Sequence, residues 1–240
     1  SLNVGNVDNR GGELSSAAAL SLGGQQLNNS DGGKLLAGSD LLLTIRQEIN
    51  QSQGLISAKG QATITGQQLD NGGGTLSTLS ALGIQLDGAL SNLDGLISSE
   101  GTLTVGAAGL NNRQGRLSSA GLLSLNSVGA IDNQRGQLLT DAGLDLHSAS
   151  LDNSESGSIS SQGPLHVTTG AIDTSRGGHL PCGNTLDLTA TQITNRDNGR
   201  IASDQALTAS MTGLDQQGGS LFSNSSVKLN LNHGLLNNQN

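Results

Sequence analysis

The sequence predicts an all-β protein, a parallel β-helix in which short strands coil around a common axis. Three observations support this fold class. Similar units of 20 to 22 residues follow one another along the chain, aliphatic residues within each unit recur at every second position, and Gly, Asn, Asp and Ser gather between them. Alternate residues of a strand share one face, whereas the i, i+3, i+4, i+7 pattern of an amphipathic helix does not recur.

Each unit begins with an aliphatic residue, and the third residue of the unit is usually Asn. The third residue is Asn in nine of the twelve units and Gln51, Thr174 or Gln216 in the others. Asn carries both donors and an acceptor, so we expect the side chains at this position to stack into a hydrogen-bonded ladder. The units start near residues 7, 27, 49, 69, 90, 110, 131, 151, 172, 193, 214 and 236.

The rest of each unit repeats with equal regularity. In the sixth unit, Gly115 is followed by the aliphatic Leu117, the small Ser119 and the apolar pair Leu123 and Leu125. The second and third aliphatic positions are six residues apart in all eleven complete units, so the length varies only in the flanking turns. The glycine usually follows the start by five residues, at Gly12, Gly32, Gly54, Gly74, Gly95, Gly115, Gly136, Gly177 and Gly219, and by six at Gly157 and Gly199.

These offsets indicate three short strands in each turn of the coil. A unit this short buries its apolar side only by stacking on its neighbours, which creates one continuous interior. We therefore expect residues 1–240 to form a single β-helical segment of about 11–12 rungs, roughly 50–60 Å long at the ~4.8 Å spacing of strands. A leucine-rich repeat has units of similar length, but its L-x-x-L-x-L-x-x-N-x-L pattern and helical half are not visible.

Two stretches carry a family resemblance. Residues 90–105 (LSNLDGLISSEGTLTV) and 110–125 (LNNRQGRLSSAGLLSL) resemble filamentous haemagglutinin repeats, and the resemblance extends from Val7 to the end of the chain. Such repeats occur in the very large two-partner-secretion exoproteins of Gram-negative bacteria, which include adhesins and the effectors of contact-dependent growth inhibition. The resemblance implies a right-handed β-helix, in agreement with the handedness of parallel β crossovers.

The same resemblance implies a function. The chain would be a fragment of a longer secreted filament at the cell surface, a virulence-associated stalk that projects an adhesive or toxin-bearing tip toward other cells. A dedicated outer-membrane transporter would export it. The alternative is a binding module whose face recognises a receptor or a glycan, and the irregular stretch Thr174–Asn198 is where we expect such a face.

Composition argues against several other classes of protein. The chain has no Trp or Tyr, one Phe and a net charge of −8, so it lacks the aromatic platforms and positive charge of a nucleic-acid binder. No apolar run approaches the ~20 residues of a membrane helix. An enzyme is not expected either, since a β-helical polysaccharide-active enzyme needs a placed carboxylate pair and no such pair interrupts the repeat.

No catalytic, cofactor-binding or metal-binding residue is predicted, and no cofactor. The lone Cys182 falls in the small-residue column and is expected to be buried and structural. The four histidines share no register, and His166 should face water. Six acidic residues at the second position of a unit are expected to be turn residues, since no calcium-binding repeat is present: Asp8, Asp70, Asp132, Asp152, Asp173 and Asp215.

Two local consequences of the repeat are also expected. Pro181 lies inside a strand and removes one N–H from the ladder, which should disturb that rung. The two end rungs should present open strand edges, so end-to-end self-contacts are expected.

Overall fold

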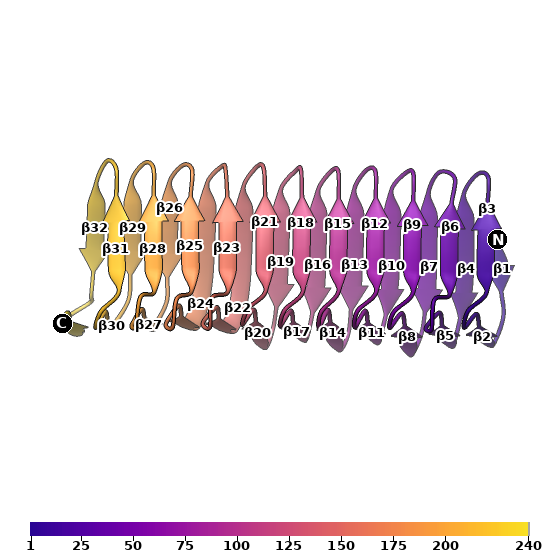
Figure 1. Cartoon of the computed structure of the whole chain (residues 1–240), viewed down its shortest axis with the longest axis horizontal. Helices are drawn as coiled ribbons and strands as arrows, with labels where there is room; N and C mark the ends of the chain where they lie inside the picture. Colours follow the sequence, from indigo (N-terminus) through magenta and orange to yellow (C-terminus); the bar gives the residue numbers. More distant parts are fainter. Residues whose placement is uncertain (240) are drawn as a thin grey trace.

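The computed structural model describes residues 1–239, which coil into a straight β-solenoid (Figure 1). Asn240, the last residue of the predicted segment, lies outside the described residues. The two termini lie at opposite ends of the rod, and the described chain contains strands and turns but no helix. The all-β prediction is therefore confirmed.

One strand of each rung belongs to an 11-stranded parallel sheet. Neighbouring strands pair in register one repeat apart, as Leu76 with Ile97 and Ile97 with Leu117. The strands are β3 (Glu13–Ser16), β6 (Lys34–Ala37), β9 (Leu55–Ala58), β12 (Thr75–Thr78), β15 (Leu96–Ser99), β18 (Arg116–Ser119), β21 (Gln137–Thr140), β23 (Ser158–Ser161), β25 (His179–Cys182), β28 (Arg200–Ser203) and β31 (Ser220–Ser223).

The other strands form two further stacks. The first stack is β1 (Leu2–Asn3), β4 (Leu20–Gly24), β7 (Leu41–Ile45), β10 (Ala62–Gly66), β13 (Leu82–Leu86), β16 (Leu103–Ala107), β19 (Leu123–Ser127), β26 (Leu186–Thr189), β29 (Leu207–Ser210) and β32 (Val227–Asn230). The second is β2 (Asn6–Asp8), β5 (Gln26–Asn28), β8 (Glu48–Asn50), β11 (Gln68–Asp70), β14 (Ala89–Ser91), β17 (Gly109–Asn111), β20 (Ala130–Asp132), β27 (Gln192–Thr194), β30 (Gly213–Asp215) and β33 (Leu235–Asn237).

Three strands per rung is the rule, but two rungs depart from it. There the second and third strands merge into β22 (Leu144–Asp152) and β24 (Leu165–Asp173), which join both stacks into one 22-stranded sheet. The merger arises because pairing continues through the corner, as Ser148 with Thr169 and Ser150 with Ala171. The prediction of three separate strands is therefore wrong in these two rungs. The right-handed sense of the coil stays a prediction.

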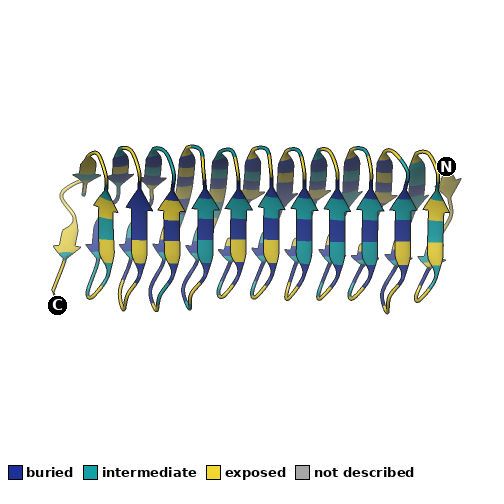
Figure 2. Cartoon of the chain, turned by 45° about the horizontal axis from the view of Figure 1, so that its top comes forward, coloured by how far each residue is buried: buried dark blue, intermediate teal, exposed yellow. Residues whose placement is uncertain are grey.

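The interior holds the predicted aliphatic columns. Leu103, Leu123 and Leu144 are fully buried, and Figure 2 shows buried and more exposed bands alternating along the strands. The small-residue column is buried as well, with Ser119 and Cys182 at 5% and 4% exposure. Fully burying a Leu or Ile is worth about 1.5–3 kcal/mol, so the stacked columns supply the main stabilising term.

One interior column was missed by the sequence analysis. It lies two residues after the predicted apolar pair, at the corner of the coil, and its residues vary from Ile to Ser. Without a recurring residue type, the alternation alone did not reveal it. Its buried members are Ile45, Leu86, Ala107, Ser127, Thr169, Ala190 and Met211.

The predicted Asn ladder is confirmed in the middle of the rod. Each Asn Nδ2 donates to the Oδ1 of the next rung, at 2.7 Å from Asn92 to Asn112 and 2.6 Å from Asn112 to Asn133. The same nitrogen of Asn112 lies 3.3 Å from the carbonyl oxygen of Gly115 and 3.2 Å from that of Gln137. The buried amide thus ties its own turn to the following rung.

The ladder is interrupted where the third residue is not Asn. Gln51 accepts from Asn29 at 2.6 Å, but its Nε2 donates to the carbonyl oxygen of Thr75, and the Oδ1 of Asn71 is buried without a hydrogen-bond partner. At the second break, Asn153 Nδ2 donates to the carbonyl oxygen of His179 at 2.9 Å and not to Thr174, whose hydroxyl in turn donates to Asn195 Oδ1 at 2.7 Å. The ladder therefore consists of separate runs.

A glycine column lies directly against this ladder. A Cβ on Gly115 would collide with the carbonyl oxygen of Asn92 in the preceding rung, and the same collision recurs along the rod. The structure corrects two predicted members of the column, because Gly33 and Gly178 occupy it in place of Gly32 and Gly177. These turns hold two successive residues at positive φ, Asp31–Gly32, Glu155–Ser156, Arg176–Gly177 and Asp197–Asn198, which accommodates one extra residue.

Replacing Gly115 with Ala should destabilise the rod by roughly 1–3 kcal/mol, because the added methyl group forces neighbouring rungs apart. Gly83 provides the matched control, since a Cβ there meets nothing within 4 Å. Gly83→Ala should be neutral or slightly stabilising. Urea unfolding followed by circular dichroism measures both, and equal effects of the two substitutions would contradict the packing role of the column.

Replacing Gln51 with Asn should stabilise the protein by about 1 kcal/mol, because an Asn at this position can donate to the unpartnered Oδ1 of Asn71. Gln216→Asn, near the exposed end of the rod, is the comparison and should gain less. Thermal and urea melts would report the difference. A loss of stability in the Gln51→Asn variant would show that the longer side chain is preferred there.

Candidate functional site

The second position of the unit, which is Asp in six of the twelve units, has a structural role in the turn. Asp132 Oδ1 accepts the backbone N–H of Gln134 at 3.1 Å, and Asp152 Oδ1 accepts that of Ser154 at 3.0 Å. The amide oxygen of Asn111 accepts the backbone N–H of Arg113 in the same way, at 3.1 Å. These are Asx turns, in which Asp and Asn serve equally. The expectation that the Asp set consists of turn residues is consistent with this geometry.

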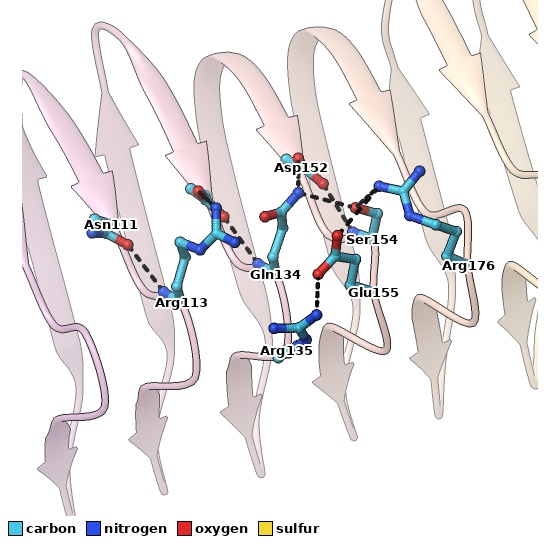
Figure 3. Close-up of polar contacts among 9 residues, drawn as sticks. Asn111, Arg113, Gln134, Arg135, Asp152, Ser154, Glu155 and Arg176 are labelled. Carbon is cyan, nitrogen blue, oxygen red and sulfur yellow. Dashed lines mark hydrogen bonds and ion pairs between the residues drawn. The ribbon is translucent and has the colours of Figure 1, made fainter.

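A stripe of charged side chains follows these turns along the rod (Figure 3). Arg135 pairs with Glu155 at 2.7 Å, Arg176 approaches the same carboxylate at 3.9 Å, and Arg113 pairs with Asp132 at 3.3 Å. The pairs link successive rungs but are partly exposed, and exposed pairs contribute little stability. Opposite charges neutralise one another here, so the stripe offers no strong patch of one sign.

The first turn holds a similar pair. Arg10 donates through its side chain and its backbone N–H to Asp8, and these hydrogen bonds lower the pKa of Asp8 to about 2. The pair is exposed to water and lies at one end of the rod. It has the features of a turn stabilised locally rather than of a reactive group.

Cys182 lies in the small-residue column, as predicted. Its Sγ is 3.3 Å from the carbonyl oxygen of Gly163 and 3.1 Å from that of Thr185. Ser161, one rung earlier, makes the equivalent contacts: its hydroxyl donates to the carbonyl oxygen of Ala142 at 2.8 Å and lies 3.4 Å from that of Pro164. Burial raises the pKa of the Cys182 thiol, which disfavours the nucleophilic thiolate. The thiol thus takes the place of a hydroxyl that ties the strand to the following turn.

The histidines are dispersed along the rod. His166 faces outward, as predicted, and its Nδ1 lies 3.2 Å from Asp187 of the neighbouring rung. Within residues 1–239, no group of three or more His, Cys, Asp or Glu side chains is arranged to hold a metal ion. No helix capable of crossing a membrane, by length and apolarity, is found in that part of the chain.

Pro181 disturbs its rung as predicted. His179 and Gly183 donate to the preceding rung at 2.8 Å, but Pro181 between them has no N–H to donate. The register of β23 with β25 is accordingly retained only at Ser158–His179 and Ser161–Cys182. The remainder of Thr174–Asn198, predicted as the most irregular stretch, forms the regularly paired strands β26 and β27.

A groove lies on the outer face of the 11-stranded sheet, and we call it the sheet groove. It comprises two adjoining hollows of about 330 and 500 Å³ that share Ser160 and Gln162. The floor consists of outward side chains from successive strands, and the side consists of residues from the turn that follows. The floor residues are Ser98, Ser118, Leu139, Ser160, Pro181, Ala202 and Phe222, and the side residues are Glu100, Ala120, Asp141, Gln162, Gly183, Asp204 and Asn224.

The sheet groove was not predicted from the sequence. Its floor alternates with the interior columns, and no residue type recurs along it beyond a preference for Ser in the middle of the rod. Phe222, the single aromatic residue, lies at one end, with the Arg200 guanidinium 4.7 Å from the ring centre. A search for outward residues at alternate strand positions would have found this column.

Comparison with known proteins gives one match. The haemagglutinin repeat family matches the chain over residues 1–47, 42–94, 81–148, 128–180 and 183–240, and so from end to end. Among curated proteins and among solved structures, none matches the chain.

Replacing Cys182 with Ser should change the free energy of unfolding by less than about 0.5 kcal/mol, because a hydroxyl meets the same two carbonyl groups. Cys182→Leu should cost roughly 1–3 kcal/mol through overpacking. Because the thiol is buried and its pKa is raised, a disulfide reagent at pH 8 should modify the native protein far more slowly than the unfolded chain. Rapid modification of the native protein would contradict the structural role.

Proposed function

Since the chain belongs to the haemagglutinin repeat family, we propose that it is a rigid stalk segment within a large secreted filament that projects a tip from a bacterial surface. The family implies an adhesin-like filament or stalk. In this proposal the tip is adhesive or toxin-bearing, an outer-membrane two-partner-secretion transporter exports the filament to a Gram-negative cell surface, and residues 1–240 are one piece of a longer parent filament.

One observation supports the stalk role above the others, the in-register pairing of eleven strands from β3 to β31. Every rung pairs with the next through backbone hydrogen bonds and packs on it through the interior columns. Length changes between units are absorbed in the turns by a residue at positive φ, such as Ser156 or Asn198. Such a stack resists bending, and its length is set by the number of units.

The composition fits export as an unfolded chain. The single Cys182 cannot form an internal disulfide, which would hinder passage through a narrow pore. Folding outside the cell would then proceed rung upon rung, each new strand pairing with the edge left by the previous one. This family is structural in character, and we propose no enzymatic activity.

The alternative, a module that binds a receptor or glycan, rests on the sheet groove. The rest of the surface carries isolated exposed apolar residues such as Leu79 and Val128, which are normal for a protein surface. One rod can serve both as a stalk and as a binding face. A deletion of whole units tests the stalk role by itself.

An in-frame deletion of residues 90–130, two whole units, in the parent filament tests the stalk. The remaining rungs should close in register, and the filament should shorten by about 10 Å at ~4.8 Å per rung. Cells with the shortened filament should retain tip activity. A deletion of the same length that begins at residue 100 removes the same number of residues and serves as a control for junction effects. Loss of activity with normal display and fold would contradict a purely spacing role.

The two end rungs should associate with one another at high concentration. Val227, Leu235 and Leu236 are 44%, 73% and 49% exposed at one end, and β3 presents an open edge at the other. Sedimentation velocity across a hundredfold concentration range should show end-to-end growth. Leu235→Lys should reduce it and Leu79→Lys, on the side of the rod, should not. A monomer throughout the range would contradict this expectation.

A further inference from the structure

We propose that the sheet groove binds a linear, uncharged oligosaccharide lying along the axis of the rod, with Phe222 and Pro181 as the apolar platform for one end of the sugar chain. This inference rests on the alternative role as a binding module, whose ligand it names, and the stalk role stands whether or not the groove is occupied. Four features of the groove support this ligand: its shape, the chemistry of its lining, its charge, and the fact that the backbone beneath it is already paired within the sheet.

The groove is shaped for an extended molecule. Floor residues occupy equivalent positions on successive strands, as the pairings of Ser98 with Ser118 and of Ser118 with Leu139 show. From Ser98 to Phe222 the floor crosses six rung spacings, which amounts to about 29 Å at ~4.8 Å each. Because the two hollows share lining residues, one continuous chain of several sugar units fits better than a compact ligand.

The lining matches the polar edge of a sugar. The hydroxyl groups of Ser118 and Ser160 on the floor can donate and accept, and Asp141 and Gln162 line the same hollow with a carboxylate and an amide. A sugar ring presents hydroxyl groups of the same dual character at regular intervals. The hydroxyl groups of the inward serines already form hydrogen bonds within the protein, as Ser119 does to the carbonyl oxygen of Gly121 at 2.8 Å. Only the outward serines can therefore bond to a ligand in the groove.

One end of the groove offers an apolar surface. Phe222 is 36% exposed, and Ala202 beside it is only 7% exposed. The Arg200 guanidinium lies over the ring, a cation–π contact that holds the ring in place. Pro181 lines the same hollow. Sugars bind by stacking the apolar face of a ring on such a platform while their edges form hydrogen bonds.

Charge argues against an anionic occupant. Glu100, Asp141 and Asp204 line the groove with Arg116 and Arg200, and the latter guanidinium is engaged with Phe222. Three carboxylates against two guanidinium groups, in a protein of net charge −8, repel a polyanion such as a nucleic acid or a sulfated glycan.

The backbone argues against an extended peptide. A peptide gains most of its affinity by adding a strand to an open sheet edge. Along the groove, strands β15 to β31 already pair with one another in sequence, and they run across the groove rather than along it. A peptide lying in the groove would therefore receive side-chain contacts alone. A sugar chain needs no backbone pairing.

The test is a titration of the 240-residue chain with hexasaccharides of neutral linear glycans, namely β-1,4-glucose, α-1,4-glucose and β-1,4-N-acetylglucosamine, followed by isothermal calorimetry. We expect at least one of them to bind with an affinity that depends little on salt. Phe222→Ala should weaken binding about three- to tenfold, the loss expected for one aromatic contact. Ser118→Arg, which fills the middle of the groove, should abolish it.

Matched controls keep the test independent of folding. Val128→Ala removes an exposed apolar side chain far from the groove, and Thr104→Arg places the same large cation on an outward strand position of another face; both should bind as the parent does. All variants should melt at similar temperatures. The proposal is overturned if none of the neutral hexasaccharides binds, if Ser118→Arg binds unchanged, or if only a heparin hexasaccharide binds.

Discussion

The buried amide at the third position of most units is the interaction on which the regularity of the rod depends. An amide taken out of water costs free energy unless its groups find partners. Asn112 meets that requirement only if the next rung brings Asn133 Oδ1 to 2.6 Å and the carbonyl oxygen of Gln137 to 3.2 Å. The polar group therefore specifies where the following rung must lie, whereas the aliphatic columns provide most of the free energy but would tolerate a small slip. The aliphatic columns therefore stabilise the rod, and the Asn ladder fixes the register between rungs.

The same constraint explains the glycine column and the tolerance of the turns. The ladder brings each turn so close to the preceding carbonyl group that Gly115 and its equivalents have no room for a Cβ. The outer part of the turn is free, because an added residue at positive φ bulges into solvent without moving the glycine. Asp197 and Asn198 do so without displacing Gly199 from the column. The intervals between units can thus vary while the strands stay in register.

Most of this architecture could be predicted because the interior repeats a residue type at a fixed spacing. The six-residue interval in each unit located the columns of Leu103 and Leu123, and the Asn positions located the ladder. The corner column of Ile45 could not be predicted, because no residue type recurs along it. In the turns with two successive glycines, the spacing predicted Gly32 in the column that Gly33 occupies. The merging of strands at Ser148 depends on the geometry of a corner, which short-range pattern does not encode.

The groove on the outward face of the sheet could not be predicted from the sequence, because residue types at the outward positions do not recur along the chain. Stacking constrains the inward columns alone, so the residue type at the outward position between two inward ones varies from rung to rung, and a groove forms there without altering the core. The sheet groove uses that freedom: Ser118, Ser160 and Phe222 alternate with interior residues that never change character. A binding face of this kind extends by addition of rungs, since each contributes one floor residue and one side residue. Length, which serves the stalk, therefore also sets the number of sugar units that the groove can hold.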